Sequence, residues 1–313
     1  MHGKIDLTKI VPNWQKALKN GIVKKADECT SLAYWINLDN QSYLFKTCDS
    51  KKEIVCNLLV QKIALKEKIP VVETRYATLG YYFGELSKNY RKKDCNYLMG
   101  SQILHEYYIY LKKEKRLTEL PIFQIETLSE EKILDQMNNL ETIWQALNFH
   151  YTALHYINKN QIVSEIMEDL VKRFCVDFLT MQKDRYNENW EIEENIQTNH
   201  AILTPLFDSN QSFSIFDFSP KMGVIDNTCL HNSVALLKNF LSLSDHSMVE
   251  YFENLVEKNK PENLEQDLQE ILKENNIHLA TEEQEEIIDS YKKHYNRIQQ
   301  VLQERKEGIK YEP

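Results

Sequence analysis

The chain has 313 residues, enough for one large domain or two lobes around a sizeable core. Its 38 basic residues against 47 acidic ones argue against a general nucleic-acid binder. The six cysteines are scattered without paired spacing, which argues against a zinc site or a disulfide framework. There is no apolar leader and no run of roughly 18 apolar residues, so we expect a soluble, cytoplasmic protein with no membrane partner.

The first third of the chain is predicted to be rich in strands. Residues 32–38 and 42–47 alternate as strands do and flank a polar turn at 39–41. Ser50 and Glu53 have the spacing of a capping box, which predicts a helix from there to about residue 65. Residues 70–74 and 81–90 are then predicted to be extended.

Helices are expected to dominate from about residue 97 onward. Apolar residues at helical spacing predict one helix through 133–147 and a second, buried helix over 161–181. Two short strands are predicted at 190–193 and 200–207, joined by a polar turn. Further helices are expected at about 228–243, 247–258, 262–275 and 281–306, the last opened by a capping box of Thr281 and Gln284.

Three oxygen-bearing residues follow the buried helix in a suggestive order. Asp184 and Asn189 have D-x-x-x-x-N spacing and lie in the loop between that helix and the first short strand. Asp208 follows the second strand. Phosphoryl transfer from a metal-bound nucleotide needs one residue to orient the attacking hydroxyl and two to hold magnesium ions. The spacing is typical of a kinase catalytic loop with its later metal ligand.

These features together predict an α+β, bilobal, protein-kinase-like fold. A strand-rich N-lobe with one inserted helix would occupy residues 1–95 and bind the nucleotide. A larger, mostly helical C-lobe would occupy 96–313 and carry the catalytic loop and the metal-binding Asp208. The nucleotide cleft would lie between the two lobes.

Lys46, at the end of the second predicted strand, is the candidate for contacting nucleotide phosphates. The identity of the carboxylate that would hold the Lys46 ammonium in place is not decided by the sequence. Glu53 is one candidate, but the capping box already gives it a structural role, and Asn57, one helical turn further on, carries no charge. The loop that would cover the phosphates is short of glycine, since Gly21 is the only one between residues 19 and 34.

Two other groups have ordinary structural interpretations. His150, His155 and His200 have no partner at metal or nucleophile spacing and are expected to be ordinary core or surface residues. The acidic excess is concentrated between residues 250 and 289 and is typical of solvated helical faces. An acidic docking surface for a basic partner is the alternative for this stretch.

The sequence resembles the HipA-like serine/threonine kinases in four stretches between residues 40 and 210. These are Tyr43-Leu44-Phe45-Lys46, then Gly84 to Tyr90 with Leu98-Met99-Gly100, then Asp177 to Trp190, and Leu203 to Ser209. The third and fourth carry most of the resemblance, since the family favours D-R-x-x-x-N followed by A-P-L-F/Y-D. The chain is similar to a short form of the family without its N-terminal subdomain.

The resemblance implies a role for each matching residue. Asp184 would be the catalytic base, Asn189 and Asp208 the magnesium ligands, and Lys46 the phosphate-binding lysine. Ser87, Lys88, Asn89 and Tyr90 would form the hinge whose backbone amides meet adenine.

The same resemblance implies the reaction and its partners. The cofactors would be ATP and Mg²⁺, and the acceptor would be a protein hydroxyl, as on translation factors. A toxin–antitoxin relation, with an antitoxin protein as partner, is implied too, without direct binding of nucleic acid by this chain.

The sequence departs from the family at three places. Tyr186 stands where a histidine often follows the D-R pair, Thr204 replaces a small residue, and residues 20–35 give no clean match to the phosphate loop. The leading hypothesis is therefore an ATP- and Mg²⁺-dependent protein serine/threonine kinase. The alternatives are a small-molecule or peptide kinase of the same fold, and a pseudokinase that acts as a binding module.

Overall fold

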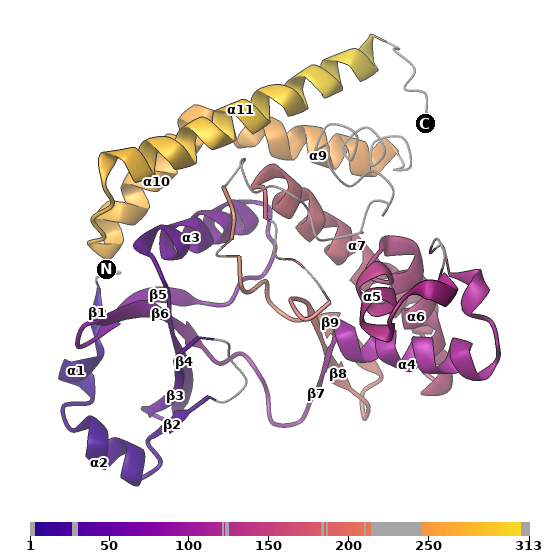
Figure 1. Cartoon of the computed structure of the whole chain (residues 1–313), viewed down its shortest axis with the longest axis horizontal. Coiled ribbons are helices and arrows are strands. Elements are labelled where there is room, and N and C mark those ends of the chain that lie inside the picture. Colours follow the sequence, from indigo (N-terminus) through magenta and orange to yellow (C-terminus); the bar gives the residue numbers. More distant parts are fainter. Residues whose placement is uncertain are drawn as a thin grey trace.

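The structure is a computed structural model that describes residues 4–26, 31–120, 122, 125–182, 185, 187–209, 211–213 and 246–307. Asp184, Tyr186 and the helix expected at 228–243 lie outside the described residues. The described part combines a strand-rich region with a larger helical one, as the sequence predicted (Figure 1).

A six-stranded sheet forms the strand-rich region, with the strand order β1-β5-β6-β4-β3-β2. Strand β1 pairs parallel with β5, and all other neighbours are antiparallel. The strands are β1 (Ile5–Asp6), β2 (Val23–Lys25), β3 (Ala33–Leu38), β4 (Gln41–Thr47), β5 (Thr74–Leu79) and β6 (Tyr82–Lys88). The central position of β4 and β6 places their side chains at the middle of the sheet.

Each face of this sheet is covered by helices. Helices α1 (Leu7–Ile10) and α2 (Trp14–Lys19) close a small core on the face that carries Phe45 and Ala77. Helix α3 (Lys51–Lys66) packs with Tyr76, whose neighbour Ala77 points to the opposite face, as alternation along a strand requires. The sheet therefore lies between the α1–α2 segment and α3 (Figure 1).

Helix α3 begins as the sequence predicted. The Ser50 hydroxyl accepts a hydrogen bond from the Glu53 amide at 3.3 Å, and the Glu53 carboxylate accepts one from the Asp49 amide at 3.4 Å. Most of the helix is buried around its circumference, including the polar Asn57. A helix buried on all sides needs cover from more than one layer, and here the sheet and the C-terminal helices both supply it.

The helical region contains a second core of its own. A three-stranded antiparallel sheet, in the order β7-β8-β9, packs with α4 to α7. Its elements are β7 (Asn96–Met99), α4 (Gly100–Lys113), α5 (Glu130–Gln136), α6 (Leu140–Ala153), α7 (Lys159–Leu179), β8 (Glu191–Asn195) and β9 (His200–Leu203), with short 3₁₀ turns η1 (Leu117–Glu119) and η2 (Ile125–Thr127). The buried helix expected over 161–181 is α7, and it delivers the chain to the loop that precedes β8.

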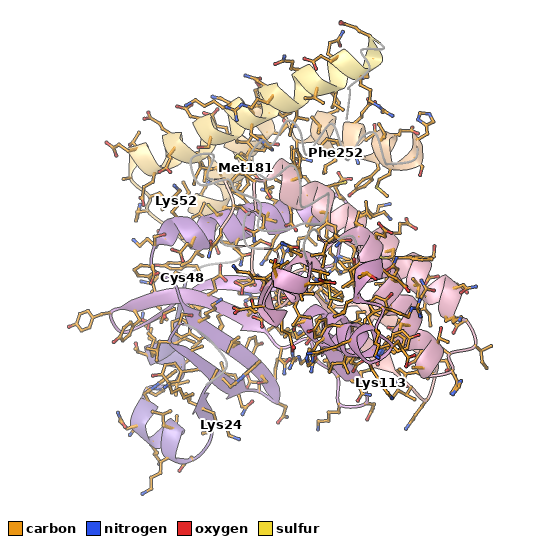
Figure 2. All side chains as sticks on the ribbon, turned by 45° about the vertical axis from the view of Figure 1, so that its right-hand side comes forward. Lys24, Cys48, Lys52, Lys113, Met181 and Phe252 are labelled. Atoms are coloured by element: carbon orange, nitrogen blue, oxygen red, sulfur yellow. The ribbon has the colours of Figure 1, made fainter. Side chains whose placement is uncertain are left out.

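Three C-terminal helices complete the fold by packing over α3 and α7 (Figures 1 and 2). They are α9 (His246–Lys258), α10 (Pro261–Asn275) and α11 (Thr281–Lys306). Their acids do not all face solvent. Asp267 of α10 is buried and accepts ion pairs from Lys62 and Lys66 of α3. Part of the acidic stretch therefore holds α3 against α10.

Several expected elements differ from the structure. The helix expected through 133–147 is broken into α5 and α6, because Asn139 caps a new helix by accepting from the Thr142 amide at 2.9 Å. Helix α11 is opened by Glu283, which accepts from the Ala280 amide at 2.9 Å, and not by a capping box of Thr281 and Gln284.

Some strands also differ from expectation. Strand β5 begins where the extended segment 70–74 was expected to end, and β1, β2 and β7 were not predicted. His150 is a buried core residue whose two ring nitrogens lie 3.0 Å from Glu106 and 2.9 Å from Glu194. Within the described residues, no helix is both long and apolar enough to cross a bilayer.

Candidate functional site

A cavity of about 950 Å³ lies between the six-stranded sheet, α3 and the loops around β8 and β9. This is the size of a site for a ligand such as a nucleotide. Its lining includes Lys46, Ser87, Lys88, Asn89, Tyr90, Asn189 and Asp208, which are the described members of the site predicted from the sequence. Asp184 is not among the described residues, so its position relative to the cavity is not part of this geometry.

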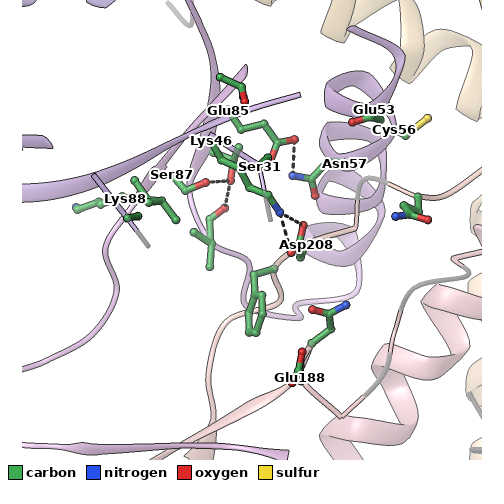
Figure 3. A pocket seen from close by; sticks show the side chains of 18 of the residues that line it. Ser31, Lys46, Glu53, Cys56, Asn57, Glu85, Ser87, Lys88, Glu188 and Asp208 are labelled. Carbon is green, nitrogen blue, oxygen red and sulfur yellow. Dashed lines mark hydrogen bonds and ion pairs between the residues drawn. The ribbon is translucent and has the colours of Figure 1, made fainter. Parts of the chain in front are cut away.

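Lys46 and Asp208 meet inside the cavity. Lys46 lies on β4, and its ammonium nitrogen is 3.1 Å from each carboxylate oxygen of Asp208 (Figure 3). The two side chains are 24% and 33% exposed, so the pair is open to the cavity and is not sealed in the core. The structure thus joins the strand-rich region to the loop after β9 through two residues that the sequence had singled out.

The loop that carries Asp208 is fixed by its backbone. Its neighbour Leu206 donates its amide to the Pro70 carbonyl at 2.7 Å and accepts from the Val72 amide at 2.9 Å. Asp208 itself has a φ of 54°, in the left-handed region that aspartate tolerates better than most residues. Its carbonyl accepts from the Gln182 side chain at 2.9 Å.

Arg185, which had no predicted role, holds this loop in place through its buried side chain. Its side chain is 1% exposed and forms two hydrogen bonds to Asp177 of α7, at 2.8 and 3.1 Å. The same guanidinium donates to the carbonyls of Asn189 and Phe207 and to the Ser209 hydroxyl. A planar group with five donors can hold several chain segments at once, and here it joins α7, the Asn189 loop and the Asp208 loop.

Asn189 is placed beside the start of α4. The Asn187 carbonyl accepts from the Ser101 amide at 2.8 Å, and the Trp190 carbonyl accepts from the Gly100 amide at 3.0 Å. A Cβ on Gly100 would lie 2.1 Å from the Trp190 ring, so only glycine fits there. These contacts fix both sides of Asn189.

Glu85, which sequence reasoning missed, is a buried carboxylate on the strand beside Lys46. It lies directly opposite Lys46 in the β4–β6 pairing and is 6% exposed. Its Oε1 accepts from the Asn57 side-chain amide at 2.8 Å (Figure 3). Burial raises the pKa of Glu85 to about 7, with Asp208 adding to the rise and Asn57 and Lys46 opposing it. Glu53, the candidate named from the sequence, is engaged in the cap of α3.

The expected hinge is tied to β8 by its side chains. The Tyr90 hydroxyl donates to Glu191 at 2.7 Å, and Arg91 forms an ion pair with the same carboxylate. Burial and Glu191 raise the pKa of Tyr90 above its ordinary value. Two of the expected hinge amides are already used within the protein, since Lys88 donates to the Glu73 carbonyl and Asn89 to the Ser42 carbonyl, both at 2.9 Å.

Ala26, just after β2, and Ser31, shortly before β3, border the cavity. Residues 27–30 lie outside the described part of the chain. The Ser31 hydroxyl is buried and forms no hydrogen bond with any residue in the described part of the chain. A buried hydroxyl without a partner is costly, so it marks a place where a ligand atom can complete the hydrogen bonding.

Comparison with known proteins identifies the fold. No family model and no curated protein matches the sequence. The structure is similar to the proinflammatory kinase CtkA of Helicobacter pylori, with a TM-score of 0.56, 12% identity, and coverage of 87% of this chain and 94% of the other. It is also similar to HipA of Shewanella oneidensis MR-1, described in complex with HipB and operator DNA. There the TM-score is 0.55 with 10% identity, and 93% of this chain and 67% of the other are covered. The chain has the bilobal, α+β fold of the HipA-like kinases.

Proposed function

We propose that this protein is an ATP- and Mg²⁺-dependent kinase that transfers the γ-phosphate to a serine or threonine hydroxyl of a protein. The observation that carries the proposal is the Lys46–Asp208 pair in a cavity of nucleotide size. A cation for phosphates and a carboxylate for metal lie side by side there, as phosphoryl transfer requires. The kinase fold of the chain supports the same reaction class.

The side chains suit the cofactors of that reaction. Asp208 and Asn189 line one cavity and offer a carboxylate and an amide oxygen, the hard ligands that magnesium prefers. Bound magnesium would neutralise the phosphate charge. Lys46 supplies a positive charge for the phosphates, and Asp184, expected from the catalytic-loop spacing, would orient the acceptor hydroxyl.

The remaining roles follow from positions around the cavity. We assign adenine recognition to the hinge Ser87–Tyr90, and chiefly to the Tyr90 amide, because Lys88 and Asn89 already donate within the protein. We assign a phosphate contact to the Ser31 hydroxyl, which has no hydrogen-bond partner among the described residues. This contact would offset the shortage of glycine between residues 19 and 34.

The likeness to HipA suggests a protein partner as well. That structure is described as a toxin–antitoxin system with HipB and operator DNA. By analogy, we propose that a small antitoxin protein binds this chain in the cytoplasm. Co-purification of the chain with the product of a neighbouring gene tests the partner separately from the reaction.

One experiment distinguishes the acceptor classes. Purified protein is incubated with γ-labelled ATP and magnesium, with and without cell extract, beside the Asp184→Ala variant. We expect label on serine or threonine of proteins, lost in the variant. Label on small molecules alone would support a small-molecule kinase, and nucleotide binding without transfer would support a pseudokinase.

A further inference from the structure

We propose that Glu85 is the residue that positions Lys46, in place of a carboxylate on α3, and that Asn57 links Glu85 to the loop of Asp208. The inference rests on the proposed function, because positioning matters only if Lys46 binds phosphates. It concerns residues to which the sequence patterns gave no role.

The first argument is the register of the sheet. Lys46 of β4 and Glu85 of β6 are directly opposite each other, so their side chains leave the same face of the sheet. Residues paired in this way have Cβ atoms about 5 Å apart. The strands approach closely here, since a Cβ on the adjacent Gly84 would lie 2.0 Å from the Lys46 carbonyl oxygen.

The second argument is the burial of Glu85. A carboxylate that is 6% exposed is stable in its charged form only beside a compensating charge or donors. Among the described residues, Asp208, Lys46 and Glu53 act on Glu85 through their charges, and Lys46 is the cation of the three. Cys48 also lies in this environment. Lys46 and the Asn57 amide are therefore the groups that stabilise an ionised Glu85.

The third argument is the position of Asn57. Its amide nitrogen donates to Glu85 at 2.8 Å (Figure 3). Its side-chain oxygen accepts from the backbone amide of Ser209 at 3.3 Å. Ser209 is the residue after Asp208. The Asn57 side chain on α3 thus connects Glu85 on β6 with the loop that carries Asp208.

These contacts explain how Lys46 stays in place during the reaction. Lys46 and a metal ion would compete for the same two carboxylate oxygens of Asp208, so the Lys46–Asp208 contact weakens when a metal ion binds. A second carboxylate beside Lys46 keeps the ammonium at the sheet when Asp208 takes a metal. Helix α3 then contributes an amide at the position where other kinases of known mechanism use a glutamate.

The test is a double-mutant cycle with Lys46→Met, Glu85→Gln and the double variant. The measurement is the calorimetric affinity for a non-hydrolysable ATP analogue with magnesium, together with kcat and KM for ATP. Glu85→Gln is expected to weaken binding about tenfold when Lys46 is present, which is about 1.4 kcal/mol, and to have little effect in the Lys46→Met background. Glu73→Gln, on an exposed glutamate of the same region, is the matched control and is expected to bind like the wild type.

Two outcomes of that cycle would overturn the inference. One is an equal loss in both backgrounds, because Glu85 would then act without Lys46. The other is a loss of nucleotide affinity in Glu53→Gln with no loss in Glu85→Gln. That result would show that a carboxylate on α3 positions Lys46.

A readout without nucleotide separates this inference from the proposed function. Urea unfolding of the same four proteins at pH 8 measures the coupling between Lys46 and Glu85 directly. Lys46→Met is expected to cost more stability with Glu85 present than with Glu85→Gln, because it leaves a buried carboxylate without its cation. If Lys46 and Glu85 are coupled but the wild type does not bind nucleotide, the proposed function is wrong and the Lys46–Glu85 pairing still holds. Additive costs would overturn the pairing itself.

Discussion

Lys46 and Asp208 lie 162 residues apart in the sequence, yet the Lys46 ammonium is 3.1 Å from both oxygens of the Asp208 carboxylate. The contact crosses the cavity between the sheet and the loop after β9. It joins the group expected to meet phosphates to the group expected to meet magnesium. The predictions below follow from this arrangement and from the residues that support it.

Arg185 is predicted to be essential for stability. Arg185→Met removes the donors of three chain segments and leaves the buried Asp177 without its cation. We expect a loss of about 3–5 kcal/mol in the free energy of unfolding, measured by urea denaturation. Arg75→Met, at an exposed ion pair with Glu73, is the control and should cost about 1 kcal/mol or less. Equal losses for the two variants would contradict the role of Arg185.

Glu85 is predicted to make stability depend on pH. Burial raises the pKa of Glu85 from its ordinary value of 4.5 to about 7, so the native state holds this proton more tightly than the unfolded chain. The resulting stabilisation is complete below about pH 4.5 and is lost as the pH rises through about 7.

The measurement is urea unfolding of the wild type and Glu85→Gln at pH 5 and pH 8. Glutamine cannot ionise, so the free energy of unfolding of the variant should increase relative to that of the wild type as the pH rises. The expected increase is on the order of 3 kcal/mol. A difference that does not change with pH would show that Glu85 has an ordinary pKa.

Asp267 is predicted to hold α3 against α10. It is buried and receives ion pairs from Lys62 and Lys66, so Asp267→Leu leaves both lysines of α3 without this partner. We expect a loss of about 1–3 kcal/mol and weaker nucleotide binding, because α3 also carries Asn57. Glu262→Leu, on the exposed side of the same helix, is the control. Loss of stability with unchanged nucleotide affinity would show that the ion pairs between α3 and α10 do not influence the site.

Ser31 is predicted to contribute to nucleotide affinity. Ser31→Ala removes a buried hydroxyl that has no hydrogen-bond partner among the described residues, so the unliganded protein should keep or slightly gain stability. Affinity for Mg²⁺ and ATP should fall by about fivefold to tenfold, the value of one ordinary hydrogen bond. The experiment is calorimetry beside thermal unfolding. A loss of stability with unchanged affinity would contradict the assignment.

The sequence singled out Lys46, Asn189 and Asp208, which line one cavity, because its signals for them are local. The stripe of α7 and the spacing of Asp184 and Asn189 are readable along one segment, and Lys46 ends a strand with clear alternation. Glu85 was missed because its role depends on pairing β6 with β4, although α3 and β5 separate these strands in the chain. Arg185 was missed because an arginine in a polar loop gives no sign of being 1% exposed. The β1–α1–α2–β2 segment was missed because its elements are too short for a periodic signal.

The choice of Glu53 illustrates the same limit. The capping box was read correctly, and it placed a glutamate on the first turn of the helix that follows Lys46. Asn57, one turn later, lines the same cavity as Glu53, and it is Asn57 that contacts Glu85, 28 residues further along the chain. Local patterns predict where a helix begins, but they do not predict which strand lies beside it.

The most direct test of the account is transfer of the γ-phosphate by the purified wild type and by Asp208→Asn, Lys46→Met and Asp184→Ala, with α-labelled ATP as a control for simple binding. The account predicts magnesium-dependent γ-label on serine or threonine of protein, reduced at least a hundredfold in each variant, and no covalent α-label. Transfer that persists undiminished in Lys46→Met and Asp208→Asn would contradict it, because the pair that joins the two sides of the cavity would then play no part in the reaction.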